Sequence, residues 1–211
     1  MNSTHPPGRG PGRPPKLGAS RFETRDALVR CGVEILTEKG FNSTGIDEVL
    51  KRVGVPKGSF YHYFASKEDF GLAVIDEYAA YFARKLDRSL LRAERAPLAG
   101  IADFIADACD GMRRYDFRRG CLVGNLGQEM GALNDAYRER LDGVLRDWEG
   151  RLAACMRAAR DAGEIAPDAD CERLAAFFWI GWEGAVLRAK LVRSTAPLEL
   201  FAEAFFAGLP R

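Results

Sequence analysis

Hydrophobic residues recur at intervals of three and four along most of the chain, the spacing that places them on one face of an α-helix. The first such stretch runs from Phe22 to Lys39, and Gly40 ends it. Further stretches lie at 67–91, 97–115, 121–130, 134–163 and 169–192, and from Pro197 onward. No segment alternates apolar and polar residues as a half-buried strand does. The pattern therefore predicts an all-α fold of about nine helices.

The segment 44–63 predicts two short helices joined by a tight turn. Thr44 precedes an acidic residue by three positions, so we expect its hydroxyl to cap the first helix. Gly54 stands where a left-handed backbone would end that helix, and Pro56 suits the first turn of the next. A short second helix from Lys57 to Tyr63 would complete a helix-turn-helix.

The second helix of this pair is unusually polar for a packed element. Only Phe60 and Phe64, four residues apart, form an apolar face. A short helix that carries donors and aromatic rings can reach base edges and phosphates in the major groove of DNA. Ser66 is expected to cap the following helix, which leaves Lys67 beside an anion-attracting helix end. The polar residues on the short helix are Lys57, Ser59, Tyr61, His62 and Tyr63.

The sequence GVPKGSFYHYFASKEDF, residues 54–70, resembles the helix 2 to helix 4 signature of the TetR family of bacterial regulators. The resemblance is strong over residues 22–70, with one departure at Leu50, where the family often has alanine. It implies a homodimeric helical repressor whose N-terminal domains bind a palindromic operator in double-stranded DNA and whose C-terminal domain holds a small-molecule effector. It also implies DNA contacts by Thr44, Lys57, Gly58, Ser59, Tyr61, His62, Tyr63 and Lys67.

We expect three parts along the chain: a flexible basic arm (1–20), a helix-turn-helix domain (21–66) and an effector-binding and dimerisation domain (67–211). The arm is rich in glycine and proline, and its RGPGRPPK segment resembles an AT-hook. Arg9 and Arg13 would then enter the minor groove, where A·T tracts are strongly negative. The alternative is a solvated tail that makes no DNA contact.

Charge is unevenly distributed along the chain. The formal net charge is only +1, but residues 1–67 hold eleven basic and six acidic side chains, a net of +5, which leaves −4 for the remainder. A basic N-terminal part suits contact with phosphates.

Several functional classes are excluded by what the sequence lacks. The five cysteines have no C-x-x-C spacing and only two histidines accompany them, which argues against a zinc site or a disulfide framework. No metal cluster, cofactor-binding loop or catalytic motif is recognisable, so we expect neither an enzyme nor a bound cofactor. The chain shows no membrane-spanning run and no signal peptide, which predicts a cytoplasmic protein without a membrane partner.

The C-terminal helices should enclose an effector cavity, the usual position of a ligand site in a helical bundle. Residues 118–130, RRGCLVGNLGQEM, resemble a segment of the TetR subgroup that includes acrylate-responsive and electrophile-responsive repressors. Cys121 follows two arginines and opens a short helix, features that lower a thiol pKa; an inert packed thiol is the alternative. The effector-site candidates are Tyr115, Arg118, Cys121, Asn125, Trp179 and Trp182.

The last two predicted helices carry apolar residues on more than one face, and this surplus predicts burial against a second copy of the chain. Together these features predict a dimeric repressor that a small metabolite, such as a short unsaturated acid or an electrophile, releases from its operator. Two alternatives remain: a structural DNA-binding protein without an effector, and a small-molecule-binding helical protein with a vestigial helix-turn-helix.

Overall fold

The computed structural model describes residues 21–91 and 94–211, which form eight α-helices and one 3₁₀ helix and contain no strand. The all-helical prediction is confirmed for these residues. Arg9 and Arg13, in the predicted basic arm, lie outside the described part of the chain. The helices are α1 (Arg21–Lys39), α2 (Ile46–Val53), η1 (Lys57–His62), α3 (Lys67–Leu90), α4 (Pro97–Arg114), α5 (Leu122–Met130), α6 (Asp135–Asp161), α7 (Cys171–Val192) and α8 (Ala196–Ala207).

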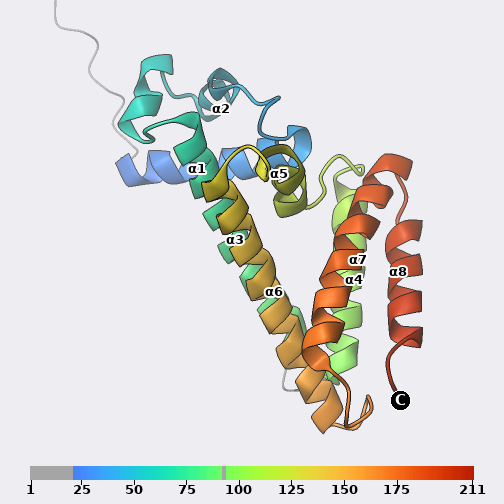
Figure 1. Ribbon diagram of the computed structural model, residues 1–211. Helices are drawn as coiled ribbons and strands as arrows, with labels where there is room; N and C mark the ends of the chain where they lie inside the picture. The colour runs from blue at the N-terminus through green and yellow to red at the C-terminus, as the bar shows by residue number, and fades with distance from the viewer. Residues whose placement is uncertain (1–20, 92–93) are drawn as a thin grey trace, which may run out of the picture.

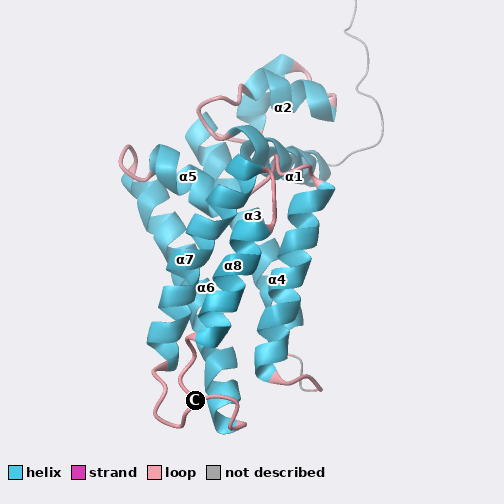
Figure 2. Cartoon of the chain, turned by 90° about the vertical axis from the view of Figure 1, so that its right-hand side faces the viewer, coloured by secondary structure: helices cyan, strands magenta, loops and turns pink. Residues whose placement is uncertain are grey.

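The three N-terminal helices cover one end of a longer helical body (Figure 1). Helix α3 leaves this end and runs the length of the body beside α6, while α4, α7 and α8 form the other side. Figure 2, turned by 90°, shows the long axes of α4, α6, α7 and α8 aligned below α1 and α2. The short helix α5 lies at the junction, where it contacts α1, α3 and α6.

Most predicted helix ends agree with the structure. Gly54 ends α2 with a φ of 76°, and its backbone N–H bonds to Lys51 O at 3.2 Å. This left-handed conformation is one that glycine adopts without a steric penalty. The Ser66 side chain accepts a hydrogen bond from Asp69 N at 3.1 Å, and Asn134 caps α6 in the same way.

The predicted cap of α2 is wrong. Gly45, and not Thr44, is the N-cap residue, and no side chain caps this helix. The Thr44 hydroxyl is buried and donates instead to Gly40 O at 2.7 Å, because the turn before α2 folds back on the end of α1. The short second helix exists as predicted but is a 3₁₀ helix that ends at His62.

Aromatic packing fixes η1 on the N-terminal helices. The Phe60 and Phe64 rings are buried and lie 5.8 and 5.0 Å, between centroids, from the Phe70 ring at the start of α3. Helix α1 approaches α3 closely at Gly32, where a Cβ atom would lie 2.5 Å from the Phe70 ring. Aromatic packing therefore fixes η1 on its buried side, and α3 begins at the same aromatic cluster.

A second aromatic cluster fills the body. Trp148 on α6 packs against Trp179 on α7 with ring centroids 5.1 Å apart, and Phe82 on α3 lies 4.3 Å from Trp148. Phe178 on α7 stacks on Trp182 and meets Phe205 on α8 edge to face. These contacts join α3, α6, α7 and α8 into one core.

Candidate DNA interface and effector cavity

Helix η1 presents its polar side chains to solvent and buries its apolar ones. Tyr61 is 70% exposed, whereas Phe60 is 1% exposed. Lys57, Gly58 and His62 are also exposed, and Ser59 and Tyr63 are half-buried. This is the arrangement that a helix lying against a DNA duplex requires.

Lys57 already has an anionic partner. Its ammonium group donates to Asp47 Oδ2 at 2.5 Å, and this hydrogen bond raises the Lys57 pKa. Both side chains are well exposed, so the pair contributes little to stability. A phosphate can therefore replace Asp47 at small cost.

Thr44 and Lys67 make contacts inside the protein. Lys67 Nζ donates to Phe41 O at 2.8 Å and lies 4.4 Å from the centroid of the Phe41 ring. The Thr44 hydroxyl is buried, as described above. Phosphate binding by either side chain would require these internal hydrogen bonds to be exchanged.

A cavity of about 560 Å³ lies between α1, α3, α4 and α7, and we call it the central cavity. Its size is within the range of small-molecule sites. The apolar part of its wall is mainly aromatic, and charged side chains of α1, α3 and α4 also contribute to the lining. Its apolar lining includes Tyr78, Phe82, Phe104, Met112, Trp182 and Val186.

Three of the six predicted effector residues line the central cavity: Tyr115, Cys121 and Trp182. The other three have different partners. Arg118 pairs with Glu38 of α1 at 2.9 Å, and the Asn125 side-chain amide donates to Thr37 O at 2.9 Å. Trp179 belongs to the aromatic core of the body. This conformation gives those three side chains no part of the cavity wall.

Arg119, and not the predicted Arg118, lies in the cavity wall. It lines the cavity, with its guanidinium carbon 4.2 Å from the centroid of the Tyr115 ring, and it pairs with Glu34 of α1 at 3.3 Å. An arginine on an aromatic ring at a cavity opening can attract an anion.

Of the two interpretations of Cys121, an activated thiol and an inert packed one, the structure favours the packed thiol. Burial raises the pKa of its thiol well above the ordinary value, and the nearby Glu183 carboxyl raises it further. The two preceding arginines pair with acids of α1, and no cationic side chain among the described residues shifts the thiol pKa. Cys121 instead caps α5, since its Sγ accepts a hydrogen bond from Gly124 N at 3.5 Å.

Glu183 and Tyr78 are cavity residues that the sequence reading missed. Burial raises the pKa of Glu183 to about 7, a shift that contact with the Cys121 thiol opposes. The Glu183 Oε1 atom is buried and has no hydrogen-bond partner in the described part of the chain. Burial also raises the pKa of Tyr78, which lies near Cys121. The available signal was a single acid in the apolar run FFWIGWEGAVL, residues 177–187.

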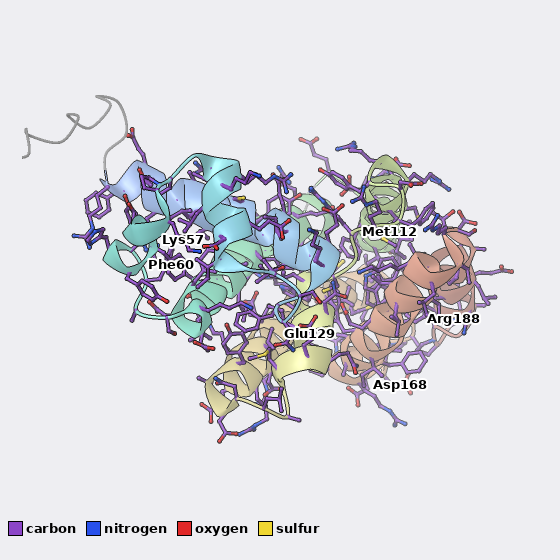
Figure 3. All side chains as sticks on the ribbon, turned by 90° about the horizontal axis from the view of Figure 1, so that it is seen from above. Lys57, Phe60, Met112, Glu129, Asp168 and Arg188 are labelled. Atoms are coloured by element: carbon purple, nitrogen blue, oxygen red, sulfur yellow. The ribbon has the colours of Figure 1, made fainter. Side chains whose placement is uncertain are left out.

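Helix α5 connects the cavity with the helix-turn-helix. Its N-terminal end meets the cavity at Cys121. At its other end, the Glu129 carboxylate accepts hydrogen bonds from Phe41 N at 2.9 Å and Asn42 N at 2.8 Å, in the turn before α2. Figure 3, seen from above, shows Glu129 between the two halves of the molecule, with Lys57 and Phe60 on one side and Met112 and Arg188 on the other.

Among residues 21–91 and 94–211, no group of three His, Cys, Asp or Glu side chains could hold a metal ion. In the same residues, no helix is long and apolar enough to cross a membrane.

Two family models match the chain. The model described as "Bacterial regulatory proteins, tetR family" matches residues 22–74, which contain the helix-turn-helix. The model described as "Tetracyclin repressor-like, C-terminal domain" matches residues 97–205, which include most of the body and much of the central cavity.

Individual regulators are similar over most of their length. The transcriptional regulator AcuR of Cereibacter sphaeroides is 56% identical over 179 residues, which cover 85% of this chain and 82% of AcuR. The HTH-type transcriptional repressor DhaR of a Mycobacterium species is 31% identical over 193 residues, or 90% of this chain and 94% of DhaR.

Solved structures agree with the fold. The regulatory protein TetR from Rhodobacter sphaeroides has a TM-score of 0.84 at 54% identity, over 88% of this chain and 98% of that one. A cysteine mutant of the regulator CifR, solved with a 26-bp operator DNA, has a TM-score of 0.75 at 22% identity, over 94% and 100% of the two chains. With two matched family models and relatives of this similarity, the chain belongs to the TetR family of bacterial transcriptional regulators, a class of DNA-binding proteins and not of enzymes.

Proposed function

We propose that this regulator represses transcription as a homodimer on a palindromic operator, and that a short unsaturated acid or an electrophile releases it by occupying the central cavity. The observation that carries the proposal is the path from cavity to helix-turn-helix through α5. Cys121 stands in the cavity wall and caps one end of this nine-residue helix, while Glu129 near the other end holds two backbone amides before α2.

The DNA contacts are assigned to η1 and its flanks. Tyr61, Lys57 and His62 are exposed on the surface of η1, so they meet the duplex first. Ser59, Gly58 and Tyr63 lie on the same short helix or at its end. Thr44 and Lys67 would approach phosphates after giving up their internal hydrogen bonds. Arg9 and Arg13, outside the described residues, would extend the interface into the minor groove.

Release follows from a shift between two conformations. An effector that separates α7 from the first turn of α5 would displace Cys121 and tilt α5. The Glu129 carboxylate would then pull the turn before α2, and η1 would move with the aromatic cluster beneath it. An effector changes the operator affinity only as far as its affinity for the two conformations differs.

Dimerisation is assigned to α7 and α8. These helices expose large apolar side chains that a single chain leaves in water, and a patch of this kind marks a contact surface. Pairing through it would give the dimer two copies of η1, which a palindromic operator requires. The patch consists of Phe177, Ile180, Leu187, Leu191, Val192 and Leu200. A regulator of this kind acts in the cytoplasm, where its DNA lies.

One experiment tests the proposal as a whole. Full-length protein is first used to select operators from random double-stranded DNA, and fluorescence anisotropy on the selected operator is then followed while sodium acrylate, sodium propionate or acrylamide is added. We expect a palindromic consensus and loss of binding with at least one of these probes. Failure to enrich any sequence at low salt would refute the DNA-binding part, and release by none of the probes would refute the proposed effector class.

A further inference from the structure

The Glu183 carboxyl lies in the wall of the central cavity, where the Cys121 thiol contacts it and one of its two oxygens has no partner among the described residues. Its Oε1 atom is buried and unpaired in the described residues, and buried polar oxygens are rarely left so. Its Oε2 atom lies over α5, where a Cβ atom on Gly124 would come within 2.2 Å of it. Glycine at 124 therefore lets the carboxyl approach the first turn of α5.

The other polar groups near this carboxyl are both protonated. The Cys121 thiol on the α5 side contacts the Glu183 carboxyl, and the Tyr78 hydroxyl of α3 lies next to that thiol. Burial raises the pKa of both groups, so neither ionises near neutral pH. Glu183 lines the cavity and Cys121 already contacts its carboxyl, so the unpaired Oε1 is the oxygen left to carry an acid proton for a ligand.

The remaining charged groups on the cavity wall are more often basic than acidic. Five basic and three acidic side chains, apart from Glu183, give the lining a net charge of +2 when Glu183 is neutral. A positive lining attracts an anion, and the aromatic wall suits a short hydrocarbon body. The basic residues are Arg30 on α1, Lys85 and Arg88 on α3, Arg114 on α4 and Arg119 before α5; the acidic ones are Glu34, Glu77 and Asp107.

We propose that Glu183 recognises the effector as a short monocarboxylate, with the protonated Oε1 donating a hydrogen bond to a carboxylate oxygen, so that one proton is shared between the two carboxyl groups. This inference rests on the proposed function, because it names the effector class of the same cavity. Two carboxylates in a desolvated site cannot both remain ionised. Binding above neutral pH must therefore be accompanied by uptake of one proton.

Because effector binding requires the Glu183 proton, the affinity for the effector should fall as the pH rises. The Glu183 pKa of about 7 is raised, so the acid is mostly protonated below that pH and loses its proton as the pH rises through it. The effector itself stays ionised, and the raised pKa values of Cys121 and Tyr78 keep both groups protonated over this range. With a pKa of about 7, the Kd for a monocarboxylate should rise about 30-fold between pH 6.0 and pH 8.5.

Isothermal titration calorimetry of the full-length protein with sodium acrylate and sodium propionate tests this proposal. Wild-type protein should bind at least one of them, show the 30-fold loss between pH 6.0 and 8.5, and take up close to one proton at pH 8.5 when phosphate and Tris buffers are compared. A pH-independent Kd, or binding of acrylamide in preference to both acids, overturns the assignment.

Variants separate Glu183 from the rest of the cavity. Glu183→Gln keeps a neutral donor, so its affinity should vary less than threefold across the same pH range, while Glu183→Leu should weaken binding more than tenfold at pH 6.0. Glu139→Gln, which changes an exposed acid of α6 outside the cavity, is the control and should keep the wild-type pH profile. Thermal melting checks that each variant is folded.

The inference about Glu183 can be wrong while the proposed function is right. If another molecule releases the operator with no dependence on Glu183, the inference is wrong and the ligand-responsive repressor stands. If the operator is never bound, the proposed function is wrong, and the pH dependence of acid binding still decides the role of Glu183.

Discussion

At the scale of single residues, Glu129 carries the contact between the two halves of the molecule. Its carboxylate accepts hydrogen bonds from two consecutive backbone amides, Phe41 N and Asn42 N. Gly40, with a φ of 84°, leaves the space that the carboxylate occupies, since a Cβ atom there would lie 1.7 Å from Glu129 Oε1. A charged acceptor on two amides is stronger than a neutral pair.

Replacing Glu129 by alanine should lower the free energy of unfolding by about 2 kcal/mol, because both amides lose a charged acceptor and one of them belongs to the buried Phe41. Urea unfolding followed by circular dichroism measures the change. Glu139→Ala is the control, since Glu139 is 73% exposed and its contact with Arg138 is 3.9 Å long. Equal stability of the two variants would contradict the role of Glu129 as a clamp.

Tyr61 is the exposed large aromatic residue of η1, with 70% of its surface open to solvent. Tyr61→Ala should weaken operator binding about tenfold, the usual size of one well-placed DNA contact. Anisotropy at constant salt gives the affinity, and Arg146→Ala, an exposed residue of α6, should bind as the wild type does. Unchanged binding by Tyr61→Ala would remove this residue from the interface.

At the scale of elements, the turn between α2 and η1 sets the orientation of the exposed helix. Gly54 is left-handed, and a Cβ atom built there would meet no other atom within 4 Å. Its requirement for glycine is thus one of backbone conformation and not of space. The aromatic cluster then transmits the orientation of this turn to the start of α3.

Gly54→Ala should therefore destabilise the protein by about 1 kcal/mol through left-handed strain alone. Gly150→Ala, in the exposed face of α6, also meets no atom but has ordinary helical geometry, so it should stabilise by up to about 1 kcal/mol. Opposite signs in thermal melts of the two variants are expected. Stabilisation by both would show that residue 54 tolerates a side chain.

Sequence patterns were sufficient to predict the helices, but they were insufficient to predict the contacts between the helices. The long helices and two of their caps, Ser66 and Asn134, depend on local spacing, which the sequence displays directly. Thr44 has the spacing of a cap, but its hydroxyl donates a hydrogen bond to Gly40 O instead. Cys121 follows two arginines along the chain, yet in space it contacts the half-buried Glu183. Burial of that acid depends on helices far apart in sequence, so local patterns do not reveal it.

At the scale of the whole molecule, the body has two different apolar regions: the central cavity inside it and an exposed face on α7 and α8. The central cavity lies between helices that pack within one chain, whereas the outer surface of α7 and α8 bears apolar side chains that no described residue covers. Ile180 is 75% exposed and Leu191 68% exposed, values unusual for residues on helices that are so apolar. The cavity and the proposed dimer contact share α7, so a ligand beside Glu183 acts on the same helix that joins the two copies.

Ile180→Asp should convert the dimer to monomers and abolish tight operator binding, because a charge would be buried in an apolar contact. Sedimentation velocity at micromolar concentration measures the assembly. Leu133→Asp changes an equally exposed leucine in the turn before α6 and should leave the dimer intact. A dimeric Ile180→Asp protein would place the contact elsewhere.

The clamp between Glu129 and the turn before α2 has a consequence for how such regulators diversify. It is made to main-chain amides, so its strength does not depend on the side chains at 41 and 42. Substitutions can accumulate in η1 and in the lining of the cavity while the hydrogen bonds from Phe41 N and Asn42 N to Glu129 stay the same. Exchanging cavity residues should thus yield sensors for new metabolites that still act on the original operator.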